Sequence, residues 1–388
     1  MEKEDEVYSE THTFQEMLNK VKRQPYMTFV GVPGSGKSAT IHHIALLLQE
    51  EGYEVVPIID IRKIEDYSDS RHPQVFVIDD VVGVLGLQKQ KLEALVDYEK
   101  IISDHSNKRT KVLMTCREAV FNECYKSFFI NEESTIKMCS SENTLNDDDK
   151  KAILQKYGLD KDLLSPTLLR KTSAMFPLLC KLYSNGANFR KNIESFFTCP
   201  TECILKEFDK MQEQNRLQYA TLVLCMLNDS KLSKKILKGT ENKVFYEMKR
   251  KALEDCEVES YTESYKFDKA LSVMQGTYTK LCGSEYTFIH DSMFEIIAYH
   301  FGSKFPNIIL QFMSSSYIAN YVKLQKYEML ELENEHKMPK VCQAFIEVLE
   351  TKSYTELKSL FLTDQKEMSK VVSKGDHVRE EIKGGDEG

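Results

Sequence analysis

The chain has 388 residues, enough for about two or three domains that each bury a core. Its 52 basic and 60 acidic residues give a formal net charge of −8, which favours neither nucleic acid nor an anionic membrane as a partner. No apolar run approaches the ~20 residues that cross a bilayer, and the ten cysteines lack the spacing of a zinc site. With an acidic N-terminus unlike a secretory signal, these features predict a cytoplasmic protein with reduced thiols.

The first 140 residues read as a lead-in followed by alternating strands and helices. Residues 1–25 are polar and contain one short amphipathic helix that Pro25 ends. The next segment, 26–140, alternates apolar β-branched runs with helical patterns, which is typical of a parallel sheet with right-handed crossovers. Strands are expected at 26–30, 53–58, 75–79, 111–116 and, as an edge strand, 135–139.

From about residue 141 the pattern becomes helical. Residues 141–212 predict a helical domain, in which Pro177 suits the first turn of a helix. Residues 213–303 read as three helices, a hairpin and a further helix, which is the layout of a winged-helix domain. Residues 304–388 are weakly helical and end in a charged tail with too little apolar surface to fold.

The glycine-rich turn after the first strand fits G-x-x-x-x-G-K-[ST] from Gly31 to Ser38. Glycines let the backbone turn tightly and direct N–H groups at phosphate oxygens, and the next helix adds its positive dipole end. Lys37 would reach the β- and γ-phosphates, and the Ser38 hydroxyl would ligate Mg²⁺. A chance match in a loop is the alternative, but a strand before the turn and an amphipathic helix after it are what the motif requires. The expected nucleotide-binding residues are Pro33, Gly34, Ser35, Gly36, Lys37, Ser38 and Ala39.

A second apolar strand, 75–78, ends in two carboxylates, Asp79 and Asp80. The carboxyl ends of strands in an open α/β sheet form the ligand edge. Asp79 is therefore expected to hold Mg²⁺, directly or through water, and Asp80 to orient or deprotonate a water that attacks the γ-phosphate. A solvated turn after the strand is the alternative, and the phosphate loop upstream favours the functional interpretation.

The strand 111–116 also ends in polar groups, Thr115 and Arg117. We expect Arg117 to sense or stabilise the γ-phosphate, and Thr115 to donate a hydrogen bond to it. Lys37, Asp80 and Arg117 are thus the candidate catalytic residues, and Ser38 and Asp79 the candidate metal ligands. The alternative for Arg117 is a strand-end arginine that pairs with a surface acid.

Together, the loop, the double-aspartate strand and the T-x-R strand end resemble the STAND class of signalling ATPases. More narrowly, GVPGSGKSATIHHIALLLQEEGYEVVPI, VFVIDDVVG, KVLMTCRE and FPLLCKLYS resemble the third group of novel STAND NTPases, over residues 25–300. The resemblance implies an α/β P-loop NTPase domain with a three-layer parallel sheet, followed by a helical domain and a winged-helix domain, in an α-rich chain. It also implies that the phosphate-loop strand and the double-aspartate strand flank the sensor strand.

Two further positions follow from the resemblance, which also implies ATP/ADP and Mg²⁺ as ligands. Pro177 stands where related ATPases have a G-x-P motif whose proline touches adenine, although Met175 replaces the glycine. A proline that opens a helix explains this position equally well. His290, in Ile-His-Asp, stands where apoptosome-type relatives carry M-H-D, whose histidine contacts the β-phosphate of ADP. A histidine beside a helix cap is the alternative.

The function expected from these features is an ATP-binding, slowly hydrolysing switch. ADP/ATP exchange would control domain closure, and the ATP state would self-associate. Hydrolysis would be slow because no arginine finger is evident in cis. Innate immune signalling or cell-death control is implied by the class alone, and the sequence identifies no protein partner.

Three alternatives remain beside the switch. A small-molecule P-loop kinase would need an arginine-rich lid and an acceptor pocket, and neither is evident after residue 117. A DNA-binding regulator would use the lysine-rich part of the winged helix, against which the net charge of −8 argues. A non-hydrolysing scaffold would bind ATP for stability only.

Overall fold

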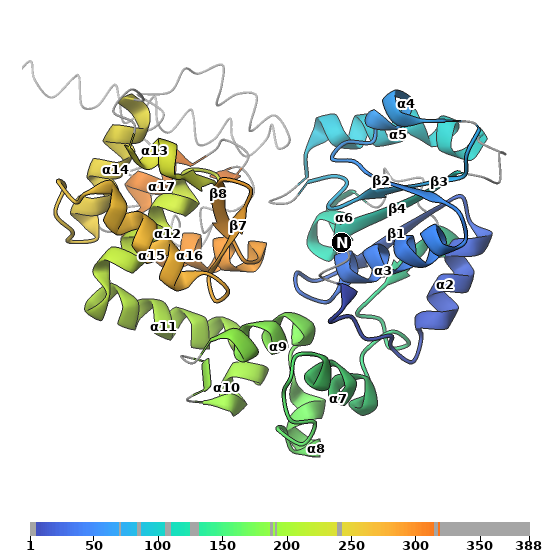
Figure 1. Ribbon diagram of the computed structural model, residues 1–388, viewed down its shortest axis with the longest axis horizontal. Coiled ribbons are helices and arrows are strands. Elements are labelled where there is room, and N and C mark those ends of the chain that lie inside the picture. Colours follow the sequence, from blue (N-terminus) through green and yellow to red (C-terminus); the bar gives the residue numbers. More distant parts are fainter. Residues whose placement is uncertain are drawn as a thin grey trace, which may run out of the picture. The chain divides into compact units, whose positions relative to one another are not determined.

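The computed structural model describes two compact units within the chain (Figure 1). The first contains the described residues up to Glu213 together with Ser272–Leu281 and Phe288–Ile296, and the second contains Gln214–Leu271, Cys282–Thr287 and those from Ile297 onward. The charged tail expected at the end of the chain lies outside the described residues, which are 5–69, 71–83, 87–104, 110–124, 132–186, 189–190, 192–238, 243–313 and 317–318.

The first unit is built on a five-stranded sheet with the order β2-β3-β4-β1-β5, and its pairs are parallel. Strand β4 lies between β1 and β3, with Gly31 opposite Arg117 and Ile78 opposite Met114. The phosphate-loop strand and the double-aspartate strand therefore flank the sensor strand, as the resemblance implied. The strands are β1 Tyr26–Gly31, β2 Glu54–Pro57, β3 Gln74–Ile78, β4 Thr110–Arg117 and, at the edge, β5 Thr135–Lys137.

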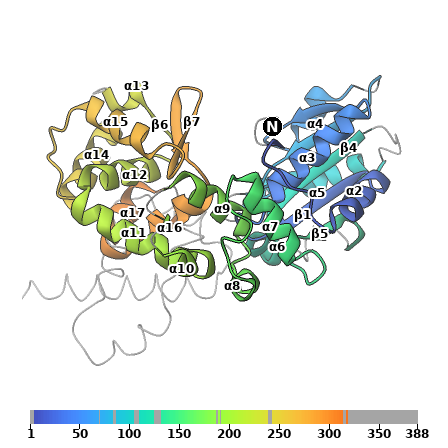
Figure 2. The same ribbon diagram turned by 60° about the horizontal axis from the view of Figure 1, so that its bottom comes forward.

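Helices cover both faces of this sheet (Figures 1 and 2). Strand residues alternate between two cores, so Val75 and Val77 pack with one set of helices while Phe76 and Ile78 pack with the other. Burial on both faces explains why the strands read as continuous apolar runs. On the first face lie α2 Phe14–Arg23 and α3 Lys37–Glu50, and on the second α4 Lys63–Tyr67, α5 Lys89–Asp104 and α6 Glu118–Cys124.

A buried lysine joins the lead-in helix to the sheet. The Nζ atom of Lys111, at the start of β4, donates to the carbonyl oxygens of Val21, Lys22 and Gln24 at 2.8, 3.0 and 3.0 Å. These carbonyls belong to the last turn of α2 and its C-cap, where helix carbonyls lack partners within the helix. Lys111 therefore caps α2 and fixes the lead-in on the phosphate-loop side of the sheet.

The remaining helices of the first unit follow the sheet, and the lead-in contacts one of them. His12 Nδ1 lies 2.6 Å from Asp149 Oδ2 in α7, while the hydroxyl of Tyr8 donates to Thr40 Oγ1 of α3 at 3.2 Å. The lead-in thus connects the phosphate-loop helix with α7. The helices are α7 Asp147–Lys156, α8 Pro166–Lys171, α9 Phe176–Asn185, α10 Ile193–Thr198 and α11 Pro200–Gln214.

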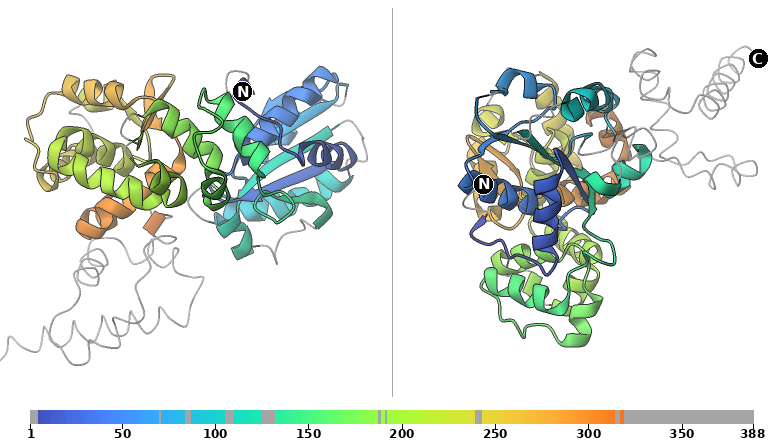
Figure 3. Two further views of the ribbon diagram at one scale, coloured as in Figure 1. Left: turned by 90° about the horizontal axis from the view of Figure 1, so that it is seen from below. Right: turned by 90° about the vertical axis from the view of Figure 1, so that its right-hand side faces the viewer.

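The chain crosses between the units within α11, α15, β7, β8 and α16. The second unit contains mostly helices (Figure 3). Its short strand β6 pairs antiparallel with β8, in a sheet of order β6-β8-β7. Between α12 and α14, β6 and α13 form where the sequence is rich in lysine. In chain order the elements are α12 Arg216–Leu227, β6 Leu232–Ser233, α13 Lys234–Lys238, α14 Lys243–Asp255, α15 Ser264–Met274, β7 Thr279–Cys282, β8 Glu285–Phe288, α16 Asp291–Lys304 and α17 Pro306–Phe312.

Among the helices in the described part of the chain, none combines the length and the apolar character that a bilayer-spanning helix needs.

Candidate functional site

The turn between β1 and α3 has a backbone that requires glycine at two positions. Gly34 and Gly36 have φ angles of +80° and +95°, in the left-handed region that side chains with a Cβ rarely adopt. Space is short as well, because a Cβ on Gly34 would lie 3.0 Å from Leu178 Cβ. A Cβ on Gly36 would lie 3.9 Å from Pro177 Cγ. The first turn of α9, with Pro177, therefore packs against the loop.

The loop leaves polar groups that suit an anion. The Ser35 hydroxyl oxygen is buried and has no hydrogen-bond partner among the described residues. Helix α3 begins at Lys37, and its N-cap, Gly36, has no side chain that could accept from the first N–H groups. A phosphate would accept from such groups and would be stabilised by the helix dipole. The residues of the loop therefore fit the phosphate chain of a nucleotide.

Lys37 is the buried cation of the loop. Its Nζ donates to the carbonyl oxygen of Val32 at 2.9 Å, and the residue is only 6% exposed. Burial lowers the pKa of Lys37, while the Asp80 carboxylate opposes the shift. An ammonium that has lost its water gains more from a phosphate oxygen than an exposed one would. The position and the electrostatics both suit the predicted role.

Asp79 lies directly after β3, and side chains from two other elements hold its carboxylate. Its Oδ1 accepts from Thr115 Oγ1 of β4 at 3.2 Å, and its Oδ2 lies 3.1 Å from His42 Nε2 of α3. Burial acts to raise the pKa of Asp79, but hydrogen bonds from His42, Ser38 and Thr115 outweigh it and lower the pKa. Ser38 and Asp79, the two predicted metal ligands, are thus in direct contact.

Asp80 has a different environment from its neighbour. Its backbone, with φ +46°, is in the left-handed region, and its N–H donates to Thr115 Oγ1 at 2.8 Å. Burial raises the pKa of Asp80 to about 6, against the lowering effect of Arg117 and Lys37. The carboxyl therefore titrates in a range that suits a general base. The hydroxyl of Thr115, which we expected to donate to a phosphate, instead links the two aspartates.

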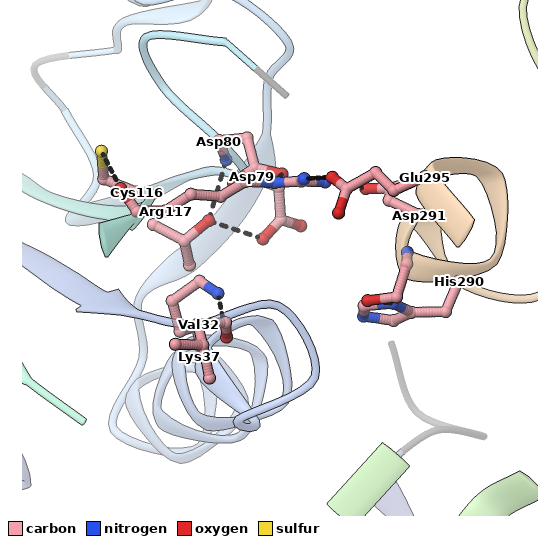
Figure 4. A network of polar contacts seen from close by, with 11 residues as sticks. Val32, Lys37, Asp79, Asp80, Cys116, Arg117, His290, Asp291 and Glu295 are labelled. Carbon is pink, nitrogen blue, oxygen red and sulfur yellow. Dashed lines mark hydrogen bonds and ion pairs between the residues drawn. The ribbon is translucent and has the colours of Figure 1, made fainter. Parts of the chain in front are cut away.

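Arg117, at the end of β4, is surrounded by carboxylates (Figure 4). Nη2 lies 2.9 Å from Asp291 Oδ2, Nη1 pairs with Glu295, and Nε lies 3.7 Å from Asp80 Oδ2. The Arg117 side chain is only 6% exposed. Each guanidinium nitrogen thus faces a protein carboxylate, and a γ-phosphate oxygen would have to displace one of them.

His290 lies in the same region as Lys37 and Arg117 (Figure 4). Burial is the main cause that lowers the pKa of His290 to about 4, and the charges of Arg117 and Lys37 add to it. Nδ1 lies 3.1 Å from both the backbone N and the Oγ of Ser292, so this nitrogen accepts and the neutral ring carries its proton on Nε2. A neutral N–H donor is thus available for an anionic ligand.

A metal at this site would depend on the nucleotide. Within the described residues, no group of three or more His, Cys, Asp or Glu side chains could hold a metal ion. Ser38 and Asp79 offer two oxygen ligands, and Mg²⁺ in such sites takes its remaining ligands from phosphates and water. The donor set therefore fits Mg²⁺ bound together with a nucleoside phosphate.

The structure also adds three residues that the sequence analysis did not assign to the site: His42, Asp291 and Glu295. The signal in the sequence that could have indicated them is their spacing from other residues of the site. His42 follows Ser38 by four residues in a helix, and Glu295 follows Asp291 by four, so each pair shares a helix face. Nothing local in the sequence indicated that α16 would reach Arg117.

Comparison with protein families found a match over the first part of the chain. The family model described as Novel STAND NTPase 3 matches residues 8–159. This match confirms the resemblance over the lead-in, the sheet and α7, whereas the segments beyond residue 159, where the helical and winged-helix domains were expected, lie outside it. Residues 8–159 therefore match a family of STAND-type NTPases, and this match supports a nucleotide-binding NTPase domain in that part of the chain.

Solved structures match this chain only at low sequence identity and low TM-score. A Walker-type ATPase of Pyrococcus abyssi is 9% identical, with a TM-score of 0.33 over 75% of this chain and 95% of that one. The Thermotoga maritima RuvB Holliday junction branch migration motor is 11% identical, with a TM-score of 0.31 over 74% and 97%. AMPPCP-bound DnaA from Aquifex aeolicus is 13% identical, with a TM-score of 0.27 over 75% and 86%. The curated proteins contain no match.

Proposed function

We propose that this protein is an ATP-binding, slowly hydrolysing switch of the STAND type. ADP/ATP exchange controls its domain closure and its self-association. The observation that carries this proposal is the pairing of Arg117 with Asp291 and Glu295 of α16. A γ-phosphate and these two carboxylates compete for the same guanidinium, so ATP and ADP differ in their effect on the contact.

Nucleotide binding is assigned to the loop Pro33–Gly34–Ser35–Gly36–Lys37–Ser38–Ala39. Its N–H groups and the Lys37 ammonium bind the phosphates, with His290 donating to the β-phosphate and Pro177 touching the base. Ser38 and Asp79 hold the Mg²⁺. The bound ion neutralises part of the phosphate charge and orients the β- and γ-phosphates.

Hydrolysis is assigned to Asp80. Its carboxyl, with a pKa raised to about 6 by burial, is largely ionised at neutral pH and accepts a proton from the attacking water. Turnover is slow because positioning and charge stabilisation carry most of this chemistry, and Arg117 is engaged with carboxylates. Arg117 reaches the γ-phosphate only after release from α16.

Switching requires that the two nucleotides stabilise two states unequally. To move a population from 1:99 to 99:1 takes about 5.5 kcal/mol of differential binding. The Arg117 contacts and the His290 N–H supply this difference, because the first responds to the γ-phosphate and the second to the β-phosphate. The helical segment 141–212 and the winged-helix segment 213–303 are the domains that close, and the helix–hairpin–helix order of the second supports this division.

A second function is favoured by one observation. In the present conformation Thr115 and Arg117 are both engaged with protein carboxylates, so the site is not assembled for hydrolysis. A cytoplasmic scaffold that binds ATP without turnover, for signalling or for stability, would have such a site. The small-molecule kinase receives no comparable support.

Asp80→Asn separates the two functions. Under the switch, this variant retains ATP during purification, loses turnover and forms oligomers, whereas under the scaffold its assembly state equals that of the wild type. Asp255→Asn in α14 is the matched control, because burial raises the pKa of that carboxyl as well. Wild-type turnover in Asp80→Asn would contradict the catalytic assignment.

A further inference from the structure

We propose that His42 is a positioning residue that holds the Asp79 carboxylate against Ser38 and thereby sets the affinity of the nucleotide complex for Mg²⁺. This inference rests on the proposed function, because it concerns the metal that binds with the nucleotide. The evidence is the hydrogen bond between His42 Nε2 and Asp79 Oδ2, at 3.1 Å.

The helix places Ser38 and His42 together. They are four residues apart in α3, so one full turn separates them and both side chains project from the same face. Asp79 hydrogen-bonds with both, although it follows β3 and is far away in the sequence. The phosphate-loop helix thus contributes both a metal ligand and a group that fixes the other metal ligand.

The two oxygens of Asp79 are held from two directions. Thr115 Oγ1 of β4 donates to Oδ1 at 3.2 Å, and His42 of α3 holds Oδ2. An ionised carboxylate only accepts, so His42 Nε2 carries the proton that it shares with Asp79. A neutral imidazole with its hydrogen on Nε2 is sufficient, and the contact needs no protonated ring.

The contact leaves Asp79 available for a ligand. The His42 side chain is 19% exposed, whereas that of Asp79 is 45% exposed, so the carboxylate still reaches solvent after the histidine has bound it. A carboxylate has about four lone-pair sites, so Asp79 can still coordinate a metal ion or accept a hydrogen bond from the ion's water. His42 therefore fixes the plane of the carboxylate without blocking it.

Fixing the plane lowers the cost of metal binding. A freely rotating aspartate must be ordered when the ion arrives, whereas this one is ordered beforehand. Partners of metal ligands in other proteins change metal affinity by about 10- to 100-fold when they are removed. We expect an effect of that size on Mg²⁺ and little effect on the phosphate loop itself, because His42 hydrogen-bonds with Asp79, which follows β3 and is not part of the loop.

A purely structural tether between α3 and β3 is the competing explanation. Removal of a tether would lower the melting temperature and weaken nucleotide binding with or without metal. Removal of a positioning group would weaken metal binding selectively. The two explanations therefore differ in one measurable quantity, the affinity for nucleotide in the presence of EDTA.

Two substitutions distinguish the role of one ring nitrogen of His42 from that of the other. The amide nitrogen of His42→Gln can stand where Nε2 stands and donate to Asp79, whereas the shorter His42→Asn reaches only the position of Nδ1. The adjacent His43→Gln is the matched control, because His43 contacts Asp5 and Glu10. Metal affinity would be measured by titrating Mn²⁺ into the full-length protein saturated with ADP, with electron paramagnetic resonance to count bound ions.

We expect His42→Asn to raise the Kd for Mn²⁺ by about 10- to 100-fold while ADP affinity in EDTA stays within about twofold of the wild type. His42→Gln should stay within about threefold, and His43→Gln should match the wild type. Equal Mn²⁺ affinity in His42→Asn and the wild type would overturn the inference, as would a parallel loss of ADP affinity in EDTA. If the wild-type protein binds no ADP at all, it is the proposed function that fails.

Discussion

Arg117 Nη2 lies 2.9 Å from Asp291 Oδ2, although 174 residues separate them in the chain. The same guanidinium pairs with Glu295, one turn later in α16. The end of the sensor strand and the start of α16 are thus joined through a charge that the proposed function also needs at the γ-phosphate. The pairing gives the switch a physical basis, because one arginine cannot satisfy both partners with the same nitrogen atoms.

The double variant Asp291→Asn, Glu295→Gln should bind ATP more tightly relative to ADP than the wild type does. Loss of two charge-assisted contacts frees Arg117, and each such bond is worth about 1.5–3 kcal/mol when buried, less at the half-exposed Asp291. We expect the affinity ratio of a non-hydrolysable ATP analogue to ADP to rise about tenfold or more. Competition titrations against a fluorescent ADP would measure it. Glu202→Gln, an exposed position on α11, is the control, and an unchanged ratio in the double variant would remove this basis for switching.

Lys37→Met should abolish nucleotide binding without unfolding the protein. Burial already lowers the pKa of Lys37, so the folded state bears the cost of an ammonium removed from water. An apolar side chain of similar length removes that cost, and the melting temperature should stay the same or rise. Calorimetric titration with ADP should show an affinity loss of about 100-fold or more, the order of a lost charge–phosphate contact. A variant that still binds ADP as the wild type does would refute the assignment of the loop.

Thr115→Val should lower the stability of the protein, because it removes the hydroxyl and its two hydrogen bonds but keeps the shape of the side chain. Valine fills the same volume but leaves the Asp80 N–H without the acceptor that it has at 2.8 Å. A buried donor left unpaired costs about 1–3 kcal/mol, so the free energy of unfolding should fall by that amount. Thr115→Ser retains the hydroxyl and should recover most of it. Equal stability of the valine and serine variants in urea denaturation would show that the hydrogen bonds contribute nothing.

His290 should make the protein less stable in mild acid. Burial lowers the pKa of His290 to about 4, below the ordinary 6.5. Between these two pH values the unfolded chain therefore binds a proton at this residue, whereas the folded chain does not. The stability that this group contributes is complete above pH ~6.5 and is lost as the pH falls toward ~4, by about 3 kcal/mol in all. His290→Asn keeps an acceptor for Ser292 without titrating, and should not show this loss.

Urea denaturation of both proteins at a series of pH values would measure the difference. His72→Asn, the same substitution at an exposed histidine, serves as the control. Identical pH profiles for the wild type and His290→Asn would mean that the histidine is not held neutral in the folded state.

Local patterns predicted the parts of the site that single segments form. The phosphate loop, Asp79, Asp80 and Arg117 stand at strand ends, and alternation of strands and helices was sufficient to bring strand ends to one edge of a parallel sheet. The order of β3, β4 and β1 came from the resemblance, because hydrophobic periodicity carries no information on which strands are neighbours.

Long-range contacts were beyond local patterns. The position of Thr115 suggested a phosphate donor, but its hydroxyl hydrogen is used by Asp79, 36 residues earlier. The sequence around Lys111, at the start of β4, does not indicate that three carbonyl groups accept from its ammonium, two in the last turn of α2 and one at its C-cap. In both cases the partner is set by tertiary packing, which the sequence around the residue does not record.

Native mass spectrometry of the full chain, with ADP and then with a non-hydrolysable ATP analogue, tests the switch most directly, since one spectrum reports both the bound nucleotide and the assembly state. A single bound ADP on a monomer, followed by oligomers that each carry the analogue, is the expected result. The same assembly state with either nucleotide would contradict switching, and a spectrum without any bound nucleotide in the presence of Mg²⁺ would contradict the assignment of the site itself.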